Sequence, residues 1–267
     1  MLIAAGRAFG ARYQMDRSLS LLAKALRLGS RRPDVLHAVG DSYRMLGRST
    51  EAEACFRQAI LLAALTTNVT RFFREPHHFD HLRDKLLPQL MQTAQNGGRV
   101  RLWSAACSSG EEPYSMALTL LDRYPEAGRY DVRILATDID PNIVKKAKVG
   151  LYRDEAVTTI PPKLRERWLR PEQQHGEKFW SVGAEARALI SFNKLNLIGD
   201  WPMKGRFDVI FCRNVVIYFE EATQVFLWNR FKTMLNPDGR LYIGHSERCD
   251  TDGYASDGMT IYKLGAK

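Results

Sequence analysis

Apolar residues follow two different patterns along this 267-residue chain. In residues 1–64 they recur at the spacing of amphipathic helices, without the alternation that strands show. After residue 99, short apolar runs alternate with amphipathic stretches, and these runs lie at residues 100–103, 132–136, 207–212 and 241–244. This alternation predicts a doubly wound α/β sheet.

The alternation stops between residues 153 and 192, where the chain is polar and contains prolines. Two short candidate strands fall in this stretch, at residues 179–182 and 188–192. We therefore expect a small antiparallel β subdomain inserted at residues 153–192.

Beyond this insertion, the pattern predicts a helix at residues 222–235, a turn at 236–239 and a strand that ends at 245–247. The expected organisation is thus an all-α N-terminal segment, residues 1–64, followed by an α/β domain, residues 65–267.

The N-terminal segment repeats itself at a period of roughly 34 residues. The matching pairs are Gly6 with Gly40, Phe9 with Tyr43, Leu22 with Phe56, and Ala25 with Ala59. Small and aromatic residues in this order let two antiparallel helices pack closely, and the segment resembles a tetratricopeptide repeat. A helical cap with accidental periodicity is the alternative, because such arrays usually need more than about two repeats.

Composition narrows the class of protein. No apolar run is long enough to cross a bilayer, and Arg7 and Arg12 interrupt the apolar N-terminus, so we expect a cytoplasmic protein without membrane insertion. The four cysteines are scattered, which predicts reduced thiols and neither a disulfide framework nor a zinc site. The net charge of +9 favours encounter with polyanions, or is simply a solvated surface.

Three loops at strand ends carry the candidate chemistry. Residues 104–115 begin with a run of small residues and include Gly110, so the backbone here can approach a ligand closely, although the stretch also fits an ordinary strand-to-helix connection. Asp138 follows the second strand, where a carboxylate can accept hydrogen bonds from ribose hydroxyls, while Asp140 before Pro141 is a candidate helix cap. Arg213 and Asn214 follow the third strand and are costly to bury without partners.

From about residue 64 to the C-terminus, the sequence resembles the CheR-type chemotaxis receptor methyltransferases, which esterify glutamate side chains on chemoreceptors. The matching motifs are LTTNVTRFFREPHHF at 65–79, WSA at 103–105, GEEPYS at 110–115, TDID at 137–140, FCRNV at 211–215 and IYF at 217–219. The resemblance implies a class I, Rossmann-like methyltransferase fold with S-adenosyl-L-methionine as cofactor.

The resemblance also implies roles for individual residues. The cofactor contacts it implies are Asn68, Thr70, Arg74, Glu112, Asp138, Asn196, Leu197, Cys212 and Arg213. It places Arg74 and Tyr218 at the reacting centre. A glutamate carboxylate is already ionised near pH 7 and can attack the sulfonium methyl group without a general base. The main task of the protein is therefore to position the carboxylate and the methyl group. Arg74 can hold the carboxylate of either the substrate or the cofactor.

Two features depart from the family pattern. The basic helical domain with which the family normally opens is not visible, and residues 1–64 take its place, offering a groove for a protein partner. Family members that tether a receptor peptide carry a Gly-x-Gly turn in the β subdomain, whereas Gly176 and Gly183 are well separated, so we do not expect tethering of that kind.

Other readings of the residues are less favoured. His77 and His78 are adjacent and would point in different directions on a helix, so we expect packing and hydrogen bonding rather than a metal site. A nucleic-acid methyltransferase would explain the positive charge, but an Asn-Pro-Pro-Tyr-type clamp is absent, and we do not expect a nucleic-acid partner. A cofactor-binding scaffold that acts through its N-terminal helices is the third alternative. The leading prediction is methyl esterification of glutamates on an acidic, chemoreceptor-like helical protein.

Overall fold

The computed structural model describes residues 19–24, 26, 33–66 and 70–265. The chain divides into two compact units, Met1–Asn68 and Val69–Lys267.

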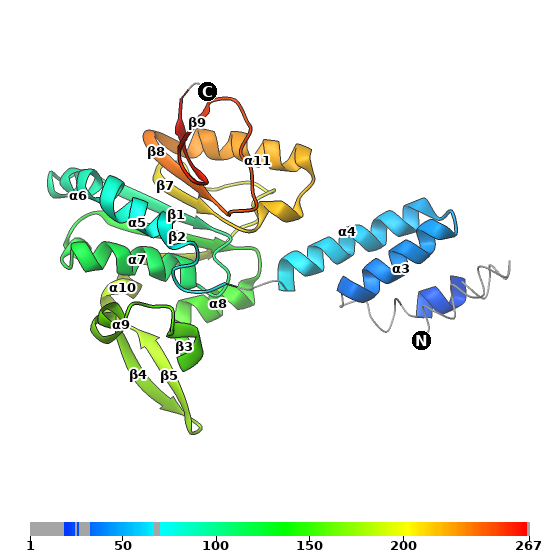
Figure 1. The fold of residues 1–267 in the computed structure, drawn as a ribbon, viewed down its shortest axis with the longest axis horizontal. Helices are drawn as coiled ribbons and strands as arrows, with labels where there is room; N and C mark the ends of the chain where they lie inside the picture. Colours follow the sequence, from blue (N-terminus) through cyan, green and yellow to red (C-terminus); the bar gives the residue numbers. More distant parts are fainter. Residues whose placement is uncertain (1–18, 25, 27–32, 67–69, 266–267) are drawn as a thin grey trace. The chain divides into compact units, whose positions relative to one another are not determined.

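The first unit contains a pair of helices, α3 (Pro33–Met45) and α4 (Ser49–Thr66), which lie side by side (Figure 1). A Cβ atom on Gly40 would lie 2.7 Å from the Phe56 ring, so the absence of a side chain at this position lets the helices approach. Val39 and Tyr43 of α3 and Ala52 and Cys55 of α4 belong to one buried hydrophobic cluster, which also includes Leu22.

Part of the predicted repeat lies outside the described residues, namely Gly6, Phe9 and Ala25, and so does the side chain of Ala59. The contact between Gly40 and Phe56 accounts for the small and aromatic positions of the second repeat unit. The likeness to a tetratricopeptide repeat stays a prediction.

The second unit is built on a seven-stranded sheet (Figure 1). In spatial order its strands are β6 (Ile190–Lys194), β2 (Val132–Asp138), β1 (Val100–Ala105), β7 (Phe207–Cys212), β8 (Leu235–Ile243), β10 (Ile261–Leu264) and β9 (Tyr254–Gly258). The first five run parallel, and β10 is antiparallel to both of its neighbours. This topology confirms the predicted doubly wound, Rossmann-like α/β class.

Helices cover both faces of this sheet. Alternate residues of each strand point to opposite faces, so one strand contributes side chains to two cores. Val100 and Leu102 pack into one core, with residues of α5 (Pro76–His81), the π-helix η1 (Leu82–Leu86), α6 (Leu87–Gln95) and α7 (Glu111–Arg123). Trp103 and Ala105 pack into the other core, with residues of α11 (Glu221–Met234). Burial on both faces explains why the central strands read as continuous apolar runs.

A separate three-stranded antiparallel sheet forms the inserted subdomain, in the order β3 (Leu151–Arg153), β5 (Glu177–Val182), β4 (Leu169–Gln174). It follows α8 (Pro141–Val149) and includes α9 (Pro162–Trp168). His175 and Gly176 both have positive φ and make the tight turn between β4 and β5.

Three details of the sequence prediction are wrong. The candidate strand at 188–192 lies not in the subdomain but in the large sheet, where β6 pairs with β2 after the short helix α10 (Ala184–Ala188). Strand β4 was not expected, because its residues beyond Leu169 are exposed and show no apolar alternation. Residues 236–239 do not form a turn before the strand but lie within β8, where the register with β7 shifts.

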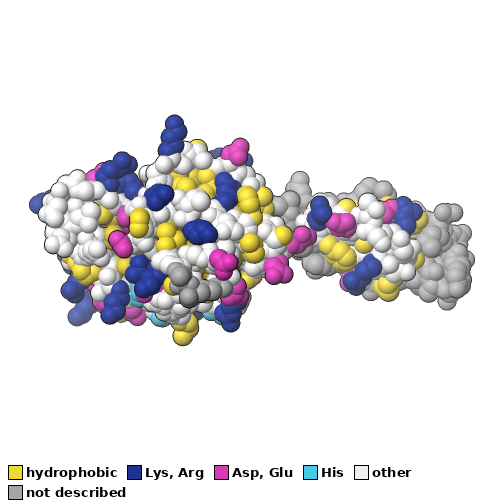
Figure 2. Space-filling view, turned by 90° about the horizontal axis from the view of Figure 1, so that it is seen from above, with side chains coloured by type: hydrophobic (Ala, Val, Ile, Leu, Met, Phe, Trp, Pro, Cys, Tyr) yellow, Lys and Arg dark blue, Asp and Glu magenta, His cyan; other side chains and the backbone are white. Residues whose placement is uncertain are grey.

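Surface charge is distributed over the face of the second unit that Figure 2 shows, where Lys and Arg side chains are scattered with acidic side chains between them. None of the described helices combines the length and the apolar character that a membrane crossing requires.

Candidate functional site

The turn after β1 opens the site at the carboxyl edge of the large sheet. Ala106, Ser108 and Gly110 all have positive φ, so the backbone bends sharply before α7 begins. A Cβ atom on Gly110 would lie 2.9 Å from both the Ala147 Cβ and the Tyr152 hydroxyl, which explains the glycine. The predicted close-approach loop is therefore a tight turn that is packed against α8 and the subdomain.

Asp138 closes β2 beside this turn. Its Oδ2 accepts a hydrogen bond from the Ser108 backbone N–H at 2.8 Å, and its Oδ1 accepts one from the Asp140 N–H at 3.1 Å. Burial raises the pKa of the Asp138 carboxyl, and these backbone donors oppose that rise. Asp140 caps α8, because its side chain accepts a hydrogen bond from the Asn142 N–H at 2.8 Å. The predicted role of Asp140 as a helix cap is therefore confirmed.

The end of β6 meets Asp138 from the other side. The Leu195 N–H donates to the Asp138 carbonyl oxygen at 2.9 Å. Two residues later Leu197 is buried, whereas Asn196 is exposed and its Oδ1 accepts from the Ile198 N–H at 3.0 Å. Predicted cofactor residues from β2 and from the segment after β6 therefore lie at the same edge.

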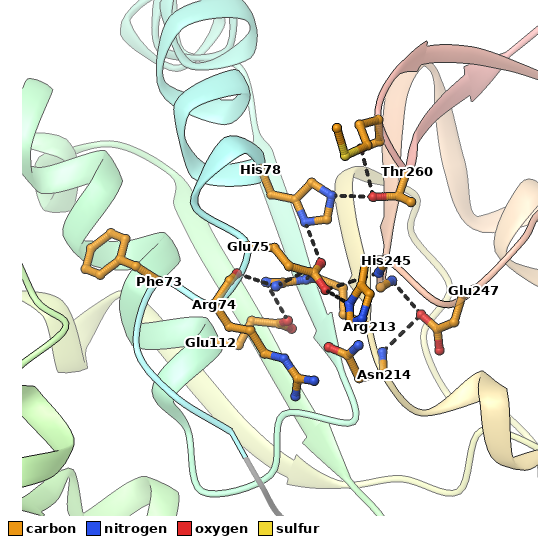
Figure 3. A network of polar contacts seen from close by, with 12 residues as sticks. Phe73, Arg74, Glu75, His78, Glu112, Arg213, Asn214, His245, Glu247 and Thr260 are labelled. Atoms are coloured by element: carbon orange, nitrogen blue, oxygen red, sulfur yellow. Dashed lines mark hydrogen bonds and ion pairs between the residues drawn. The ribbon is translucent and has the colours of Figure 1, made fainter.

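Arg213 is the centre of a buried ionic cluster (Figure 3). Its side chain is 2% exposed and contacts Glu75 Oε2 at 3.2 Å through Nη2 and Glu112 Oε2 at 3.3 Å through Nη1. Nη2 also donates to the Arg74 carbonyl oxygen. The guanidinium lies 5.6 Å from the ring centroids of both Phe79 and Phe211. One cation thus joins the end of β7 to the start of α7 and to the segment before α5.

The two carboxylates respond differently to this arrangement. Burial raises the pKa of Glu112, against the opposing influence of Arg213 and of the Ser104 hydroxyl, which donates to Glu112 Oε1 at 2.7 Å. Burial would also raise the pKa of Glu75, but Arg213 and His245 outweigh it and bring that pKa to about 2. Glu75 is therefore ionised at neutral pH.

Glu75 was not among the predicted site residues. It has φ 57°, a left-handed conformation that is uncommon for a residue with a side chain, and it directly precedes Pro76 at the start of α5. Its Oε1 accepts from the His245 backbone N–H at 3.1 Å and lies 2.8 Å from His245 Nδ1. The carboxylate therefore ties the start of α5 to the turn after β8.

His78 lies within this network. Its Nε2 lies 2.9 Å from Thr260 Oγ1, and its Nδ1 lies 3.4 Å from Glu75 Oε2. Burial and the charge of Arg213 lower its pKa to about 3, so its ring is neutral. Within the described parts of the chain, no group of three or more His, Cys, Asp or Glu side chains is placed to hold a metal ion.

The neutral state of His78 predicts how stability depends on pH. The unfolded chain takes up a proton on this histidine below about pH 6.5, whereas the folded protein does not until about pH 3. Stability from this group is therefore complete above about pH 6.5 and is lost as the pH falls through that window, by up to about 1.4 kcal/mol per pH unit. In urea unfolding between pH 7 and pH 5, His78→Gln should flatten this dependence, and an equal slope in both proteins would contradict it.

The remaining predicted site residues are placed less completely. Asn68 lies outside the described residues, and Thr70 is half-buried. Cys212 is fully buried in β7 with a thiol pKa that burial raises well above its usual value, so its sulfur is no thiolate nucleophile. Tyr218 is half-buried at the end of the 3-10 helix η4 (Val216–Tyr218), which follows the β7 turn. Hydrogen bonds and an ion pair join Arg74 and Glu112 to Arg213.

Comparison with known proteins identifies the chain. Residues 68–260 match the family model "CheR methyltransferase, SAM binding domain". A probable chemotaxis protein methyltransferase of Rhizobium etli is 51% identical over 210 residues, which is 78% of this chain and 78% of that protein. The chemotaxis protein methyltransferases of Borreliella burgdorferi and Escherichia coli are 42% and 40% identical, over 70% and 75% of this chain and over 66% and 68% of their own lengths. The chain therefore belongs to the CheR family and is an S-adenosylmethionine-dependent methyltransferase.

Proposed function

We propose that the protein transfers the methyl group of S-adenosylmethionine to glutamate side chains on the cytoplasmic helices of a chemoreceptor. The products are a glutamate methyl ester and S-adenosylhomocysteine. The observation that carries the proposal is the extent of the family match, which spans the loops after β1, β2, β6 and β7 together with the segment before α5.

The residues at the carboxyl edge suit this cofactor. The Asp138 oxygens accept from backbone N–H groups, including those of Ser108 and Asp140, and a carboxylate has about four acceptor positions, so Asp138 can also accept from the ribose. At the other end of the cofactor, Glu112 can accept from the methionine ammonium, and Arg74 with Arg213 supplies positive charge beside the methionine carboxylate. We propose that Asn68, Thr70, Asn196, Leu197 and Cys212 also contact the cofactor, as the resemblance to the family implies.

The acceptor chemistry requires positioning rather than proton removal. A glutamate carboxylate is ionised near pH 7, and one of its oxygens forms a C–O bond to the methyl carbon as the S–C bond breaks. The electron pair of that bond returns to sulfur, which becomes neutral. Tyr218 would orient the acceptor carboxylate through its hydroxyl, and Arg74 would hold a carboxylate at the same centre.

Tyr218→Phe should separate catalysis from binding. Removing the hydroxyl should lower kcat by about 10-fold or more, because an orienting hydrogen bond is lost in the transition state. The dissociation constant of S-adenosylmethionine, measured by calorimetry, should stay near that of the wild type. A wild-type rate would remove Tyr218 from the reacting centre.

We also propose that residues 1–64 bind a protein partner and that the protein acts in the cytoplasm. The close packing of α3 on α4 supports a preformed helical surface of this kind. Immobilised residues 1–64 should retain the receptor or one of its signalling partners, and equal retention by beads that carry no protein would contradict this.

The product identifies the acceptor group. The protein is incubated with S-adenosylmethionine carrying a labelled methyl group and with a receptor cytoplasmic fragment, and the labelled fragment is then treated with mild base. Glutamate methyl esters release the label as methanol. Base-stable label would contradict the proposal and indicate transfer to nitrogen.

A further inference from the structure

Glu247 is a buried carboxylate in the turn after β8. It is not among the residues assigned to the cofactor or to the reacting centre. Its exposed fraction is 2%. Oε1 accepts hydrogen bonds from the backbone N–H groups of Val215 at 2.9 Å and Val216 at 2.8 Å. Oε2 accepts from the N–H groups of Asn214 at 3.0 Å and Gly244 at 2.5 Å. A single side chain therefore satisfies four backbone donors, and Figure 3 shows Glu247 beside one of them, Asn214.

These donors belong to two turns that are pressed together. Asn214 has φ 58°, so the chain reverses sharply where it leaves β7. A Cβ atom on Gly244 would lie 2.8 Å from the Asn214 backbone nitrogen, too close for any side chain. A buried charge without partners would cost several kcal/mol, and the set of four donors is what makes Glu247 tolerable here.

The turn held by Glu247 lies between two groups of the site. Arg213 precedes it and is fixed by Glu75 and Glu112. Tyr218 follows it, and its backbone N–H donates to the Val215 carbonyl oxygen at 3.3 Å. Three successive backbone amides between these two residues donate to one carboxylate. The backbone between Arg213 and Tyr218 is therefore restricted in its motion.

We propose that Glu247 is a positioning residue, which holds the turn Asn214–Val216 and thereby places the Tyr218 hydroxyl at the reacting centre. The proposal rests on the proposed function, because it takes the role of Tyr218 from there. Glu247 itself touches neither reactant. The cofactor contacts assigned to Arg213 do not depend on it, because Glu75 and Glu112 hold the guanidinium from another side.

Glu247→Gln is the direct variant, because it keeps the shape of the side chain and loses the charge. The glutamine amide has one acceptor oxygen, so its NH₂ group must face two backbone N–H donors. Amide hydrogen exchange at residues 214–216 should become faster in this variant. Its kcat should fall by about 10- to 100-fold, since small misplacements of a positioned group cost that much, while the cofactor dissociation constant changes by less than about threefold.

Asp208→Asn is the matched control at the opposite end of β7. The Asp208 carboxylate accepts from the Arg101 backbone N–H at 2.8 Å and from Asn236 Nδ2 at 2.7 Å, so the variant also disturbs a carboxylate that binds backbone. Asp208→Asn should lower the stability of the protein. Its kcat and its amide hydrogen exchange at residues 214–216 should equal those of the wild type. Gly244→Ala is a second test, because it keeps the carboxylate but forces the two turns apart, and it should reproduce the fast exchange and the low kcat.

The double variant Glu247→Gln/Tyr218→Phe tests whether the effect passes through Tyr218. In the Tyr218→Phe background, Glu247→Gln should lower kcat by less than about twofold, because the hydroxyl that it positions is already gone. Full multiplication of the two effects would overturn the proposal, and so would unchanged exchange at residues 214–216 in Glu247→Gln. A wild-type rate in Tyr218→Phe alone would instead refute the role that the proposed function gives Tyr218, and the positioning of its hydroxyl would fail with it.

Discussion

Arg213→Met is expected to destabilise the second unit by about 3–5 kcal/mol at neutral pH, because it leaves two buried carboxylates without their common cation. Glu75 and Glu112 are each about one-tenth exposed in their side chains, at 10% and 13%, and both face the guanidinium. The methionine fills the space between Phe79 and Phe211 but supplies no charge. Urea unfolding followed by circular dichroism measures the loss.

The pH dependence of this variant separates a charge effect from a packing effect. In the wild type, Arg213 lowers the pKa of Glu75, which contributes stability above about pH 4.5 that is lost as the pH falls towards 2. In Arg213→Met the pKa values of the two carboxyls should rise, so the deficit should shrink as the pH falls from 7 to 5. Arg101→Met is the control, because its partner Asp131 is half-exposed and the pair contributes at most about 1 kcal/mol. The loss of stability in Arg213→Met could be as small as in Arg101→Met, or it could stay the same between pH 7 and pH 5. Either result would contradict the proposed role of the Arg213 charge.

Asp138→Ala is expected to weaken S-adenosylmethionine binding by about 1–3 kcal/mol, or about 5- to 150-fold, through lost charge-assisted hydrogen bonds to the ribose. Asp138 is buried at the end of β2 with both oxygens oriented by backbone N–H groups, so its carboxylate is fixed before a ligand arrives. Calorimetric titration gives the affinity directly.

Asp140→Ala is the matched control for this substitution. Asp140 lies two residues away and caps α8, so its loss should lower stability by about 1 kcal/mol and leave cofactor affinity unchanged. Equal affinities in wild type and Asp138→Ala, or equal losses in both variants, would contradict the ribose role.

The large sheet could be predicted from the sequence, because strands that are buried on both faces appear as continuous apolar runs. Strands β1 and β7 are buried at five of their six positions, and their apolar runs were recognised at the correct places. Strand β4 carries no such signal, since five of its six residues are exposed and its existence depends on pairing with β5. The position of β6 in the large sheet also depends on a long-range pairing, with β2, that the local pattern does not reveal.

The site was predictable where a residue follows directly from a strand. Asp138 and Arg213 stand at the ends of β2 and β7, so topology alone places them at one edge. Glu75 and Glu247 were not predicted, because their partners lie 138 and about 30 residues away along the chain. The local hints were the position of Glu75 between Arg74 and Pro76 and that of Glu247 just after a strand, and neither shows which groups the carboxylate binds.

Glutamate methylation of a chemoreceptor is best tested by tandem mass spectrometry of a receptor cytoplasmic fragment after reaction with the protein and S-adenosylmethionine. We expect added methyl groups on glutamate side chains of the fragment, formed by the wild type and strongly reduced in Asp138→Ala at low cofactor concentration. Methyl groups on lysine or arginine, or no transfer to the fragment by a protein that binds the cofactor, would contradict it.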